Sequence, residues 1–220
     1  MDDTLYPERD FVLSGFRAVS DWVERTLGIP SDQSYAELKS LSEKGVRGDT
    51  FDRWLALHEL PSADLEAQMV RIYRDHLPSL TPFPQVPELL DSLGRRYRLG
   101  LLSDGYLAVQ RRKLDALGLS HHFDAIVFSD EWGREAWKPS PKPYLIALQR
   151  LAADAARSVY VADNATKDFL GTRRLGIFGI WVRRSNGVYA HLEPPTPQHM
   201  PDLTITSLVK LEQILDSGRP

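Results

Sequence analysis

Residues that could bind a phosphate together with a divalent cation occur at four places in this 220-residue chain. In chain order they are Asp2 in the opening MDDTLYPE, Ser103 in LLSDG, Lys138 in FSDEWGREAWKPSP, and Asp163 and Asp168 in YVADNATKD. Carboxylates bind Mg²⁺, a lysine offsets the charge of a phosphate, and a hydroxyl group binds its oxygens. These side chains therefore predict joint binding of metal and phosphate if the fold brings them together.

Alternating strands and helices in the second part of the chain can bring them together. Short unbroken apolar runs predict strands at 98–103, 125–129, 158–163 and 178–183, and amphipathic segments predict helices near 85–96, 106–117, 141–154 and 166–174. The stretch EPPTPQHMPDLTITSL is expected to lead into a last strand and helix. Such alternation indicates a parallel sheet with helices on both faces, and ligands bind at the carboxyl ends of its strands. The candidate residues follow those ends.

Residues from about 8 to 78 have a different texture, because their apolar residues recur at helical spacing. Breaks at 28–32, 44–49 and 59–64 divide this block into three or four helices, with Ser62 as a candidate N-cap. The stretch SLTPFPQVP then places three prolines in nine residues, which indicates a linker.

The composition excludes several classes of protein. The net charge is −3 and no basic block is present, so nucleic acid is not expected as a partner. The absence of cysteine excludes disulfides and thiolate chemistry. No segment is long and apolar enough for a membrane span, and the start lacks the profile of a signal peptide. We expect a cytoplasmic, globular protein.

The segments DDTLYPE, LLSDG, WKPSPKPY and YVADNATKD, in this order and spacing, resemble the haloacid dehalogenase-like hydrolases over almost the whole chain. Each segment alone is a weak signal, but all four in order are a strong one. The resemblance implies an α/β fold, with a Rossmann-like, doubly wound parallel sheet as the core and an inserted α-helical cap. The implied core is residues 1–7 and 82–220, and the implied cap is residues 8–81.

The family's first motif is a strand that ends in Asp-x-Asp-x-Thr, whose first aspartate attacks phosphorus. Aligned on this motif, Asp2 is the second aspartate, Asp3 the variable position and Thr4 the threonine. The nucleophile would then precede Met1, and the first central strand would be absent from the chain. We interpret Met1 as an internal methionine of an Asp-Met-Asp-Asp-Thr-Leu motif. The chain as written is accordingly expected to be inactive and marginally stable.

The resemblance also implies roles for the catalytic residues. Asp2 would protonate the leaving oxygen and later activate water, while its main-chain carbonyl binds Mg²⁺. Ser103 would hydrogen-bond the transferred phosphoryl group and could at the same time cap the following helix. Lys138 is favoured over Lys142 as the phosphate-facing lysine by its spacing to the following prolines and Tyr144.

The remaining roles concern the metal and the substrate. Asp163 is the expected metal ligand, and Asp168 would support the metal through water or hold the lysine. The expected substrate site also includes Thr4, Asp104, Gly105 and, from the KGVRGD loop of the cap, Arg47. Asp104 stands where the family often has Asn, which adds a negative charge near an anion.

The sequence thus predicts a Mg²⁺-dependent phosphatase that hydrolyses a small phosphate monoester through an aspartyl-phosphate intermediate. The expected partner is a small-molecule phosphate ester, and the protein is expected to be a monomer or a homodimer. One alternative is a haloacid dehalogenase, which uses the same nucleophile without metal. Another is a non-catalytic relative that binds a phosphometabolite or a protein. Retention of the acid, lysine and metal residues together favours the phosphatase.

Overall fold

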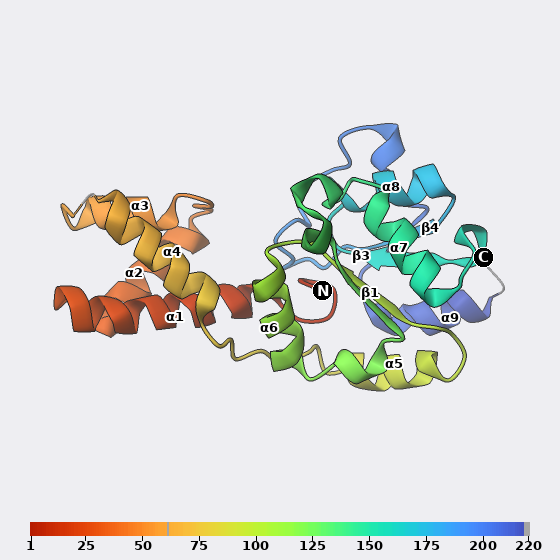
Figure 1. The fold of residues 1–220 in the computed structure, drawn as a ribbon, viewed down its shortest axis with the longest axis horizontal. Helices are drawn as coiled ribbons and strands as arrows, with labels where there is room; N and C mark the ends of the chain where they lie inside the picture. Colours follow the sequence, from red (N-terminus) through yellow and green to blue (C-terminus); the bar gives the residue numbers. More distant parts are fainter. Residues whose placement is uncertain (61, 218–220) are drawn as a thin grey trace. The chain divides into compact units, whose positions relative to one another are not determined.

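A computed structural model describes residues 1–60 and 62–217 of the chain (Figure 1). The chain divides into two compact units. The strand unit comprises Met1–Glu8 and Leu80–Pro220, and the helical unit comprises Arg9–Ser79. The last three residues of the predicted core, 218–220, lie outside the described residues.

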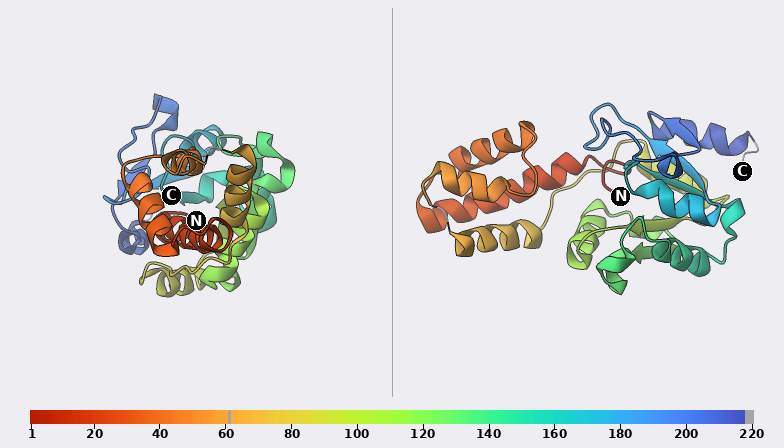
Figure 2. Two further views of the ribbon diagram at one scale, coloured as in Figure 1. Left: turned by 90° about the vertical axis from the view of Figure 1, so that its left-hand side faces the viewer. Right: turned by 90° about the horizontal axis from the view of Figure 1, so that it is seen from above.

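The described residues of the helical unit form four helices, at the upper end of the predicted number. Their bounds are α1 Glu8–Leu27, α2 Ser31–Glu43, α3 Thr50–Leu57 and α4 Ala63–Asp75. The predicted N-cap is confirmed, because Ser62 Oγ accepts a hydrogen bond from the Leu65 N–H at 3.3 Å. Within the unit α2 packs on α3, and α3 packs on α4 (Figure 2). Fully buried side chains, among them Val19, Leu38 and Trp54, form its own core.

The strand unit contains the predicted strands and helices close to their expected positions. The strands are β1 Gly100–Ser103, β2 Ala125–Phe128, β3 Val159–Ala162, β4 Phe178–Val182 and β5 Leu203–Ile205. The helices are α5 Val86–Gly94, α6 Leu107–Leu117, α7 Lys142–Leu151, α8 Asp168–Leu175 and α9 Leu211–Asp216. Helix α5 begins inside the predicted linker, at Val86. Pro87 does not prevent this, because it lies in the first turn of the helix, where proline is tolerated.

All the strand pairs are parallel, which confirms the predicted α/β class, but the strands of the described residues form two sheets. One sheet has the order β1-β2 and the other the order β3-β4-β5. β1 and β3 therefore each pair on one side only among the described residues. Helix α7 packs on β1 and β2, while α8 packs on β4 (Figure 1).

Residues 2–5 form a compact turn rather than a strand, and this segment is called the first turn below. The Leu5 N–H donates to the Met1 carbonyl at 2.8 Å, and the side chains of Thr4 and Tyr6 are buried. Across the described helices, none combines the length and the apolar character that crossing a bilayer requires.

Candidate active site

The first turn and the ends of the two sheets meet at one place. Thr4 Oγ1 donates to Asp163 Oδ1 at 3.3 Å, just after β3. On the other side, the Asp2 carboxylate pairs with Lys113 of α6, the helix that follows β1, at 2.7 Å. The turn therefore contacts the segment that follows β3 and the helix that follows β1, and ligand sites in this kind of fold lie at the carboxyl ends of such strands.

Lys138 forms a buried ion pair at this place. Its Nζ lies 2.7 Å from Asp168 Oδ1, and the two side chains are 8% and 2% exposed. It also donates to the Tyr160 hydroxyl at 3.2 Å. Burial alone would lower the pKa of Lys138, but the neighbouring Asp168 outweighs it and raises this pKa well above its usual value. The lysine thus carries a fixed positive charge, as phosphate binding requires.

Asp168 is held from two directions. Its Oδ2 accepts the Asn164 N–H at 2.9 Å, which ties the loop after β3 to the start of α8. Its Oδ1 is buried, and apart from the ion pair with Lys138 no donor of the described residues is aligned to hydrogen-bond it. This contact corresponds to the lysine-holding alternative of the two expected roles.

Asp163 lies in an environment that opposes its negative charge. Burial and the nearby charge of Asp168 raise its pKa to about 7, although the α-amino group of Met1 and the ammonium of Lys138 oppose this effect. The α-amino group of Met1 is itself buried, which lowers its pKa, and it lies within electrostatic reach of the same carboxylates. A divalent cation would relieve the repulsion between the two aspartates.

Asp2 has a different surrounding. Its Oδ1 accepts hydrogen bonds from the Tyr6 hydroxyl and from Lys113 Nζ. Burial would raise the pKa of Asp2, but Lys113 and the α-amino group of Met1 outweigh it and lower the pKa to about 2. In this arrangement Asp2 is a carboxylate that points toward α6.

Asp104, the departure from the family pattern, is surrounded by donors. Its side chain is 3% exposed and accepts bonds from Ser129 Oγ at 2.7 Å and from Lys167 Nζ at 3.2 Å. Both of its carboxylate oxygens also accept the Lys138 N–H, at 3.3 and 3.1 Å. Burial would raise the pKa of Asp104, but Lys138 and Lys167 outweigh it and lower this pKa. The extra negative charge is therefore compensated, and it fixes the backbone of the loop between β2 and α7, residues 129–141, which we call the lysine loop.

Ser103 and Gly105 flank this aspartate. Ser103 is 3% exposed and its Oγ donates to Gln110 Oε1 of α6 at 3.0 Å. Gly105 has φ +123°, and a Cβ there would come within 2.5 Å of Gln110 Nε2. Any larger residue would be strained at this position and would displace Gln110.

Arg47 and Lys142 belong to different units of the chain. Arg47 is in the helical unit, between α2 and α3, and donates to Ser42 Oγ at 3.0 Å. Its substrate role stays a prediction. Lys142, the rival of Lys138, opens α7, and its N–H donates to Ser140 Oγ at 3.4 Å.

Sequence reasoning missed Lys113, Lys167 and Tyr160. Lys113 had a visible signal, because it falls at helical spacing between Val109 and Leu117 on the apolar face of α6. An ionised lysine on such a face needs a buried anion as its partner. Lys167 and Tyr160 had no such signal, since their contacts with Asp104 and Lys138 depend on tertiary structure.

The chain is similar to known proteins over most of its length. Residues 1–182 match the family described as haloacid dehalogenase-like hydrolase. The chain is 33% identical over 215 residues to a glyceraldehyde 3-phosphate phosphatase of Methanopyrus kandleri, covering 93% of this chain and 90% of the relative. It is 32% identical over 188 residues to a protein of the same name from Methanothermobacter thermautotrophicus, covering 83% and 82%.

A solved structure of a phosphatase is also similar to this chain. The crystal structure of a HAD phosphatase from Thermococcus onnurineus superposes with a TM-score of 0.63 at 26% identity, covering 100% of this chain and 97% of that one. The family match spans the first turn, the lysine loop and the loop after β3. This chain therefore belongs to the haloacid dehalogenase-like hydrolase family.

Proposed function

We propose that this protein is a Mg²⁺-dependent phosphatase that acts on a small phosphate monoester through an aspartyl-phosphate intermediate. The observation that carries the proposal is the buried pair of Lys138 and Asp168 beside Asp163. A fixed cation next to two carboxylates provides charge for a phosphate and ligands for a metal at one place.

The residues fit Mg²⁺ in part. Carboxylate oxygens are ligands that this cation prefers, and Asp168 Oδ1 is a buried oxygen whose partner is the ammonium of Lys138 at 2.7 Å. Among the described residues, however, no group of three histidine or acidic side chains is arranged so that it could hold a metal ion. We infer that Asp163 and the Asp2 carbonyl would hold the ion together with the nucleophile, and Asp168 would support it. When bound, Mg²⁺ would neutralise charge on the phosphate.

The proposed nucleophile is an aspartate placed immediately before Met1. The buried α-amino group of Met1 lies near Lys138, Asp163 and Asp168, so a residue attached there would enter the same cluster. Its carboxylate would attack phosphorus as the bond to the leaving oxygen breaks, and Asp2 would donate a proton to that oxygen. Water, deprotonated by Asp2, would then attack the acyl phosphate and release inorganic phosphate and the free aspartate.

In this scheme the chain's own residues orient and bind. Lys138 holds the phosphoryl oxygens, and Ser103 hydrogen-bonds them after its hydroxyl turns from Gln110. For Asp2 to act as an acid, its contact with Lys113 must loosen, because that contact keeps it ionised. Glyceraldehyde 3-phosphate is the substrate to test first, because two relatives that match most of the chain are named glyceraldehyde 3-phosphate phosphatase.

The test compares three proteins: the chain as given, a form extended before Met1 by an apolar strand ending in Asp, and the same extension ending in Asn. Phosphate release from p-nitrophenyl phosphate and from glyceraldehyde 3-phosphate is measured with and without Mg²⁺. We expect turnover only for the Asp form and only with Mg²⁺, because only that form has a nucleophile.

Three results would contradict the proposal. Equal turnover by the Asp and Asn forms would show that the assigned nucleophile is wrong. No turnover by a folded Asp form that binds Mg²⁺ would favour the non-catalytic relative. Release of halide from 2-chloropropionate by the Asp form without Mg²⁺ would favour the dehalogenase instead.

A further inference from the structure

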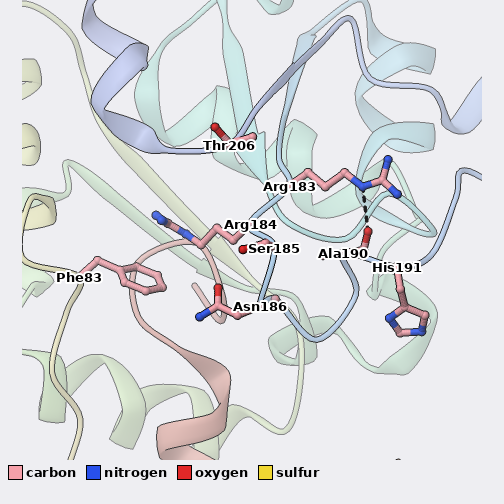
Figure 3. Close-up of a pocket in the computed structure, with 9 residues that line it drawn as sticks. Phe83, Arg183, Arg184, Ser185, Asn186, Ala190, His191 and Thr206 are labelled. Carbon is pink, nitrogen blue, oxygen red and sulfur yellow. Dashed lines mark hydrogen bonds between the residues drawn. The ribbon is translucent and has the colours of Figure 1, made fainter.

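The loop after β4 lines an open cavity of about 720 Å³, together with Phe83 and Thr206 (Figure 3). Its two arginines, Arg183 and Arg184, point in opposite directions (Figure 3). Arg183 Nε donates to the Ala190 carbonyl at 2.8 Å, and Arg184 Nε donates to the Asp3 carbonyl at 3.2 Å. Because the two cations diverge and both already bind carbonyls, they do not form a converging anion site.

Arg184 instead joins three segments of the strand unit. Besides the Asp3 carbonyl, its guanidinium reaches the Thr4 carbonyl at 3.5 Å. Its charged carbon lies 3.8 Å from the centre of the Phe83 ring, a cation–π contact. Phe83 in turn donates its N–H to the Leu5 carbonyl at 2.9 Å. The planar guanidinium thus contacts both the first turn and the segment where the chain re-enters the strand unit.

Asp3 ties the same turn to the same loop from the other side. It is 5% exposed and has φ 45°, a left-handed conformation that is uncommon for a residue with a side chain. Its Oδ1 accepts the Glu8 N–H at 2.9 Å, and its Oδ2 accepts the Val188 N–H at 2.6 Å. The side-chain bonds therefore hold a backbone conformation that would otherwise be unfavourable.

This network acts on residues of the candidate site. The two carbonyls that Arg184 binds lie on either side of the Thr4 N–H, and Thr4 Oγ1 contacts Asp163. Asp2 directly precedes the same carbonyls. A shift of the turn would therefore move both the acid–base residue and a contact of the expected metal ligand.

We propose that Arg184 and Asp3 are positioning residues, which clamp the turn of residues 2–5 to the loop after β4 and to Phe83. Neither is assigned contact with the substrate. The expected effect of this clamp on kcat rests on the proposed function. The expected effect on the stability of the turn does not depend on any activity.

The test uses Arg184→Met, with Arg183→Met as the matched control and Arg184→Lys as the conservative variant. Residue-level amide hydrogen exchange is followed at Phe83, Glu8 and Val188, with Ile180 of β4 as a reference for global opening. Arg184→Met removes the hydrogen bonds from the guanidinium to the Asp3 and Thr4 carbonyls. We therefore expect the three amides to exchange about tenfold faster in this variant. Arg183→Met should leave these amides within about twofold of the parent, and Arg184→Lys should fall between the two.

The kinetic part uses the extended, Asp-containing protein at a temperature where all variants are fully folded. Misplacement of the acid–base residue predicts that Arg184→Met lowers kcat about 10- to 100-fold with little change in KM, and that Arg184→Lys restores part of it. Unchanged exchange at the three amides would overturn the clamp whatever the activity. Faster exchange with an unchanged kcat would overturn the positioning role. If the parent itself shows no turnover, the proposed function fails, and the exchange result still decides the clamp.

Discussion

At the scale of single residues, Asp104 shows how a departure from the family pattern is accommodated. Among the described residues, its two oxygens accept hydrogen bonds from Ser129 Oγ, Lys167 Nζ and the Lys138 N–H. An amide at this position would place an NH₂ group against at least one of them. The negative charge of Asp104 is therefore compensated by these donors.

We predict that Asp104→Asn destabilises the protein by about 1–3 kcal/mol, because a buried donor loses its acceptor and Lys167 loses its anion. Urea unfolding measures this loss. Adding Lys167→Met should recover part of it, since the double variant no longer leaves the ammonium unpaired. Asp115→Asn, on the exposed side of α6, is the control. A midpoint for Asp104→Asn equal to that of the control would contradict the compensated pair.

The residues that could be predicted from sequence are those that lie at strand ends within recognisable segments, such as Ser103, Lys138 and Asp163. Their partners mostly could not. Lys167 and Arg184 look like ordinary surface cations in the sequence, because nothing in their local pattern identifies the carboxylate or carbonyl that each one meets. The contact of Asp2 with Lys113 also joins residues far apart in the chain, so it could not be predicted from local pattern. The sequence indicated only that Lys113 lies on the apolar face of α6 and needs a partner.

At the scale of elements, α2 and α3 of the helical unit are joined by Glu37. Its carboxylate accepts hydrogen bonds from Trp54 Nε1 at 2.8 Å and Gln33 Nε2 at 2.9 Å, and His58 Nε2 lies 2.7 Å from it. Burial would raise the pKa of Glu37, but the bonds from His58, Gln33 and Trp54 outweigh it and lower this pKa. The ionised carboxylate is therefore favoured in the folded state.

A lowered pKa in the folded state means that this stabilisation is present above the unfolded pKa and is lost as pH falls through the folded one. We predict that the urea midpoint, followed by tryptophan fluorescence, falls between about pH 5.5 and pH 3 more steeply in the parent than in Glu37→Gln. Glu24→Gln, on the exposed surface of α1, should behave like the parent. Parallel pH profiles for the parent and Glu37→Gln would rule out a contribution from this carboxylate.

The positions of the elements were largely predictable, and the physical reason is periodicity. Unbroken apolar runs gave β1 to β4 within about two residues, since strands buried on both faces have little room for polar side chains. The division into two sheets was not predicted, because hydrophobicity marks a strand but not its hydrogen-bonding neighbours.

At the scale of the whole molecule, the strand unit contains two sheets whose carboxyl ends nevertheless meet. The Asp104–Lys167 pair joins the segments that follow β1 and β3, and the turn of residues 2–4 touches both sides through Asp2 and Thr4. In the described part of the chain each of these two strands offers one unpaired edge. Free edges are sites where another strand can add.

We predict that an apolar strand added before Met1 pairs with β1 and β3 and merges the two sheets. With about four large apolar side chains buried at roughly 1.5 to 3 kcal/mol each, the gain in the free energy of unfolding should be about 6 to 12 kcal/mol. Typical stabilities are about 5 to 15 kcal/mol, so the change should be visible as a large shift of the urea midpoint.

The matched control is an extension of equal length in which serine replaces each apolar residue, because it can form the same backbone hydrogen bonds without the apolar burial. A larger midpoint shift for the apolar form, together with slow exchange of the β1 and β3 amides, would support a single sheet. Equal midpoints for the two extended forms and the parent would mean that the unpaired edges of β1 and β3 do not accept a strand. The nucleophile proposed at the end of that strand would then lack a rigid support beside Lys138 and Asp163, so this stability measurement also bears on the catalytic proposal.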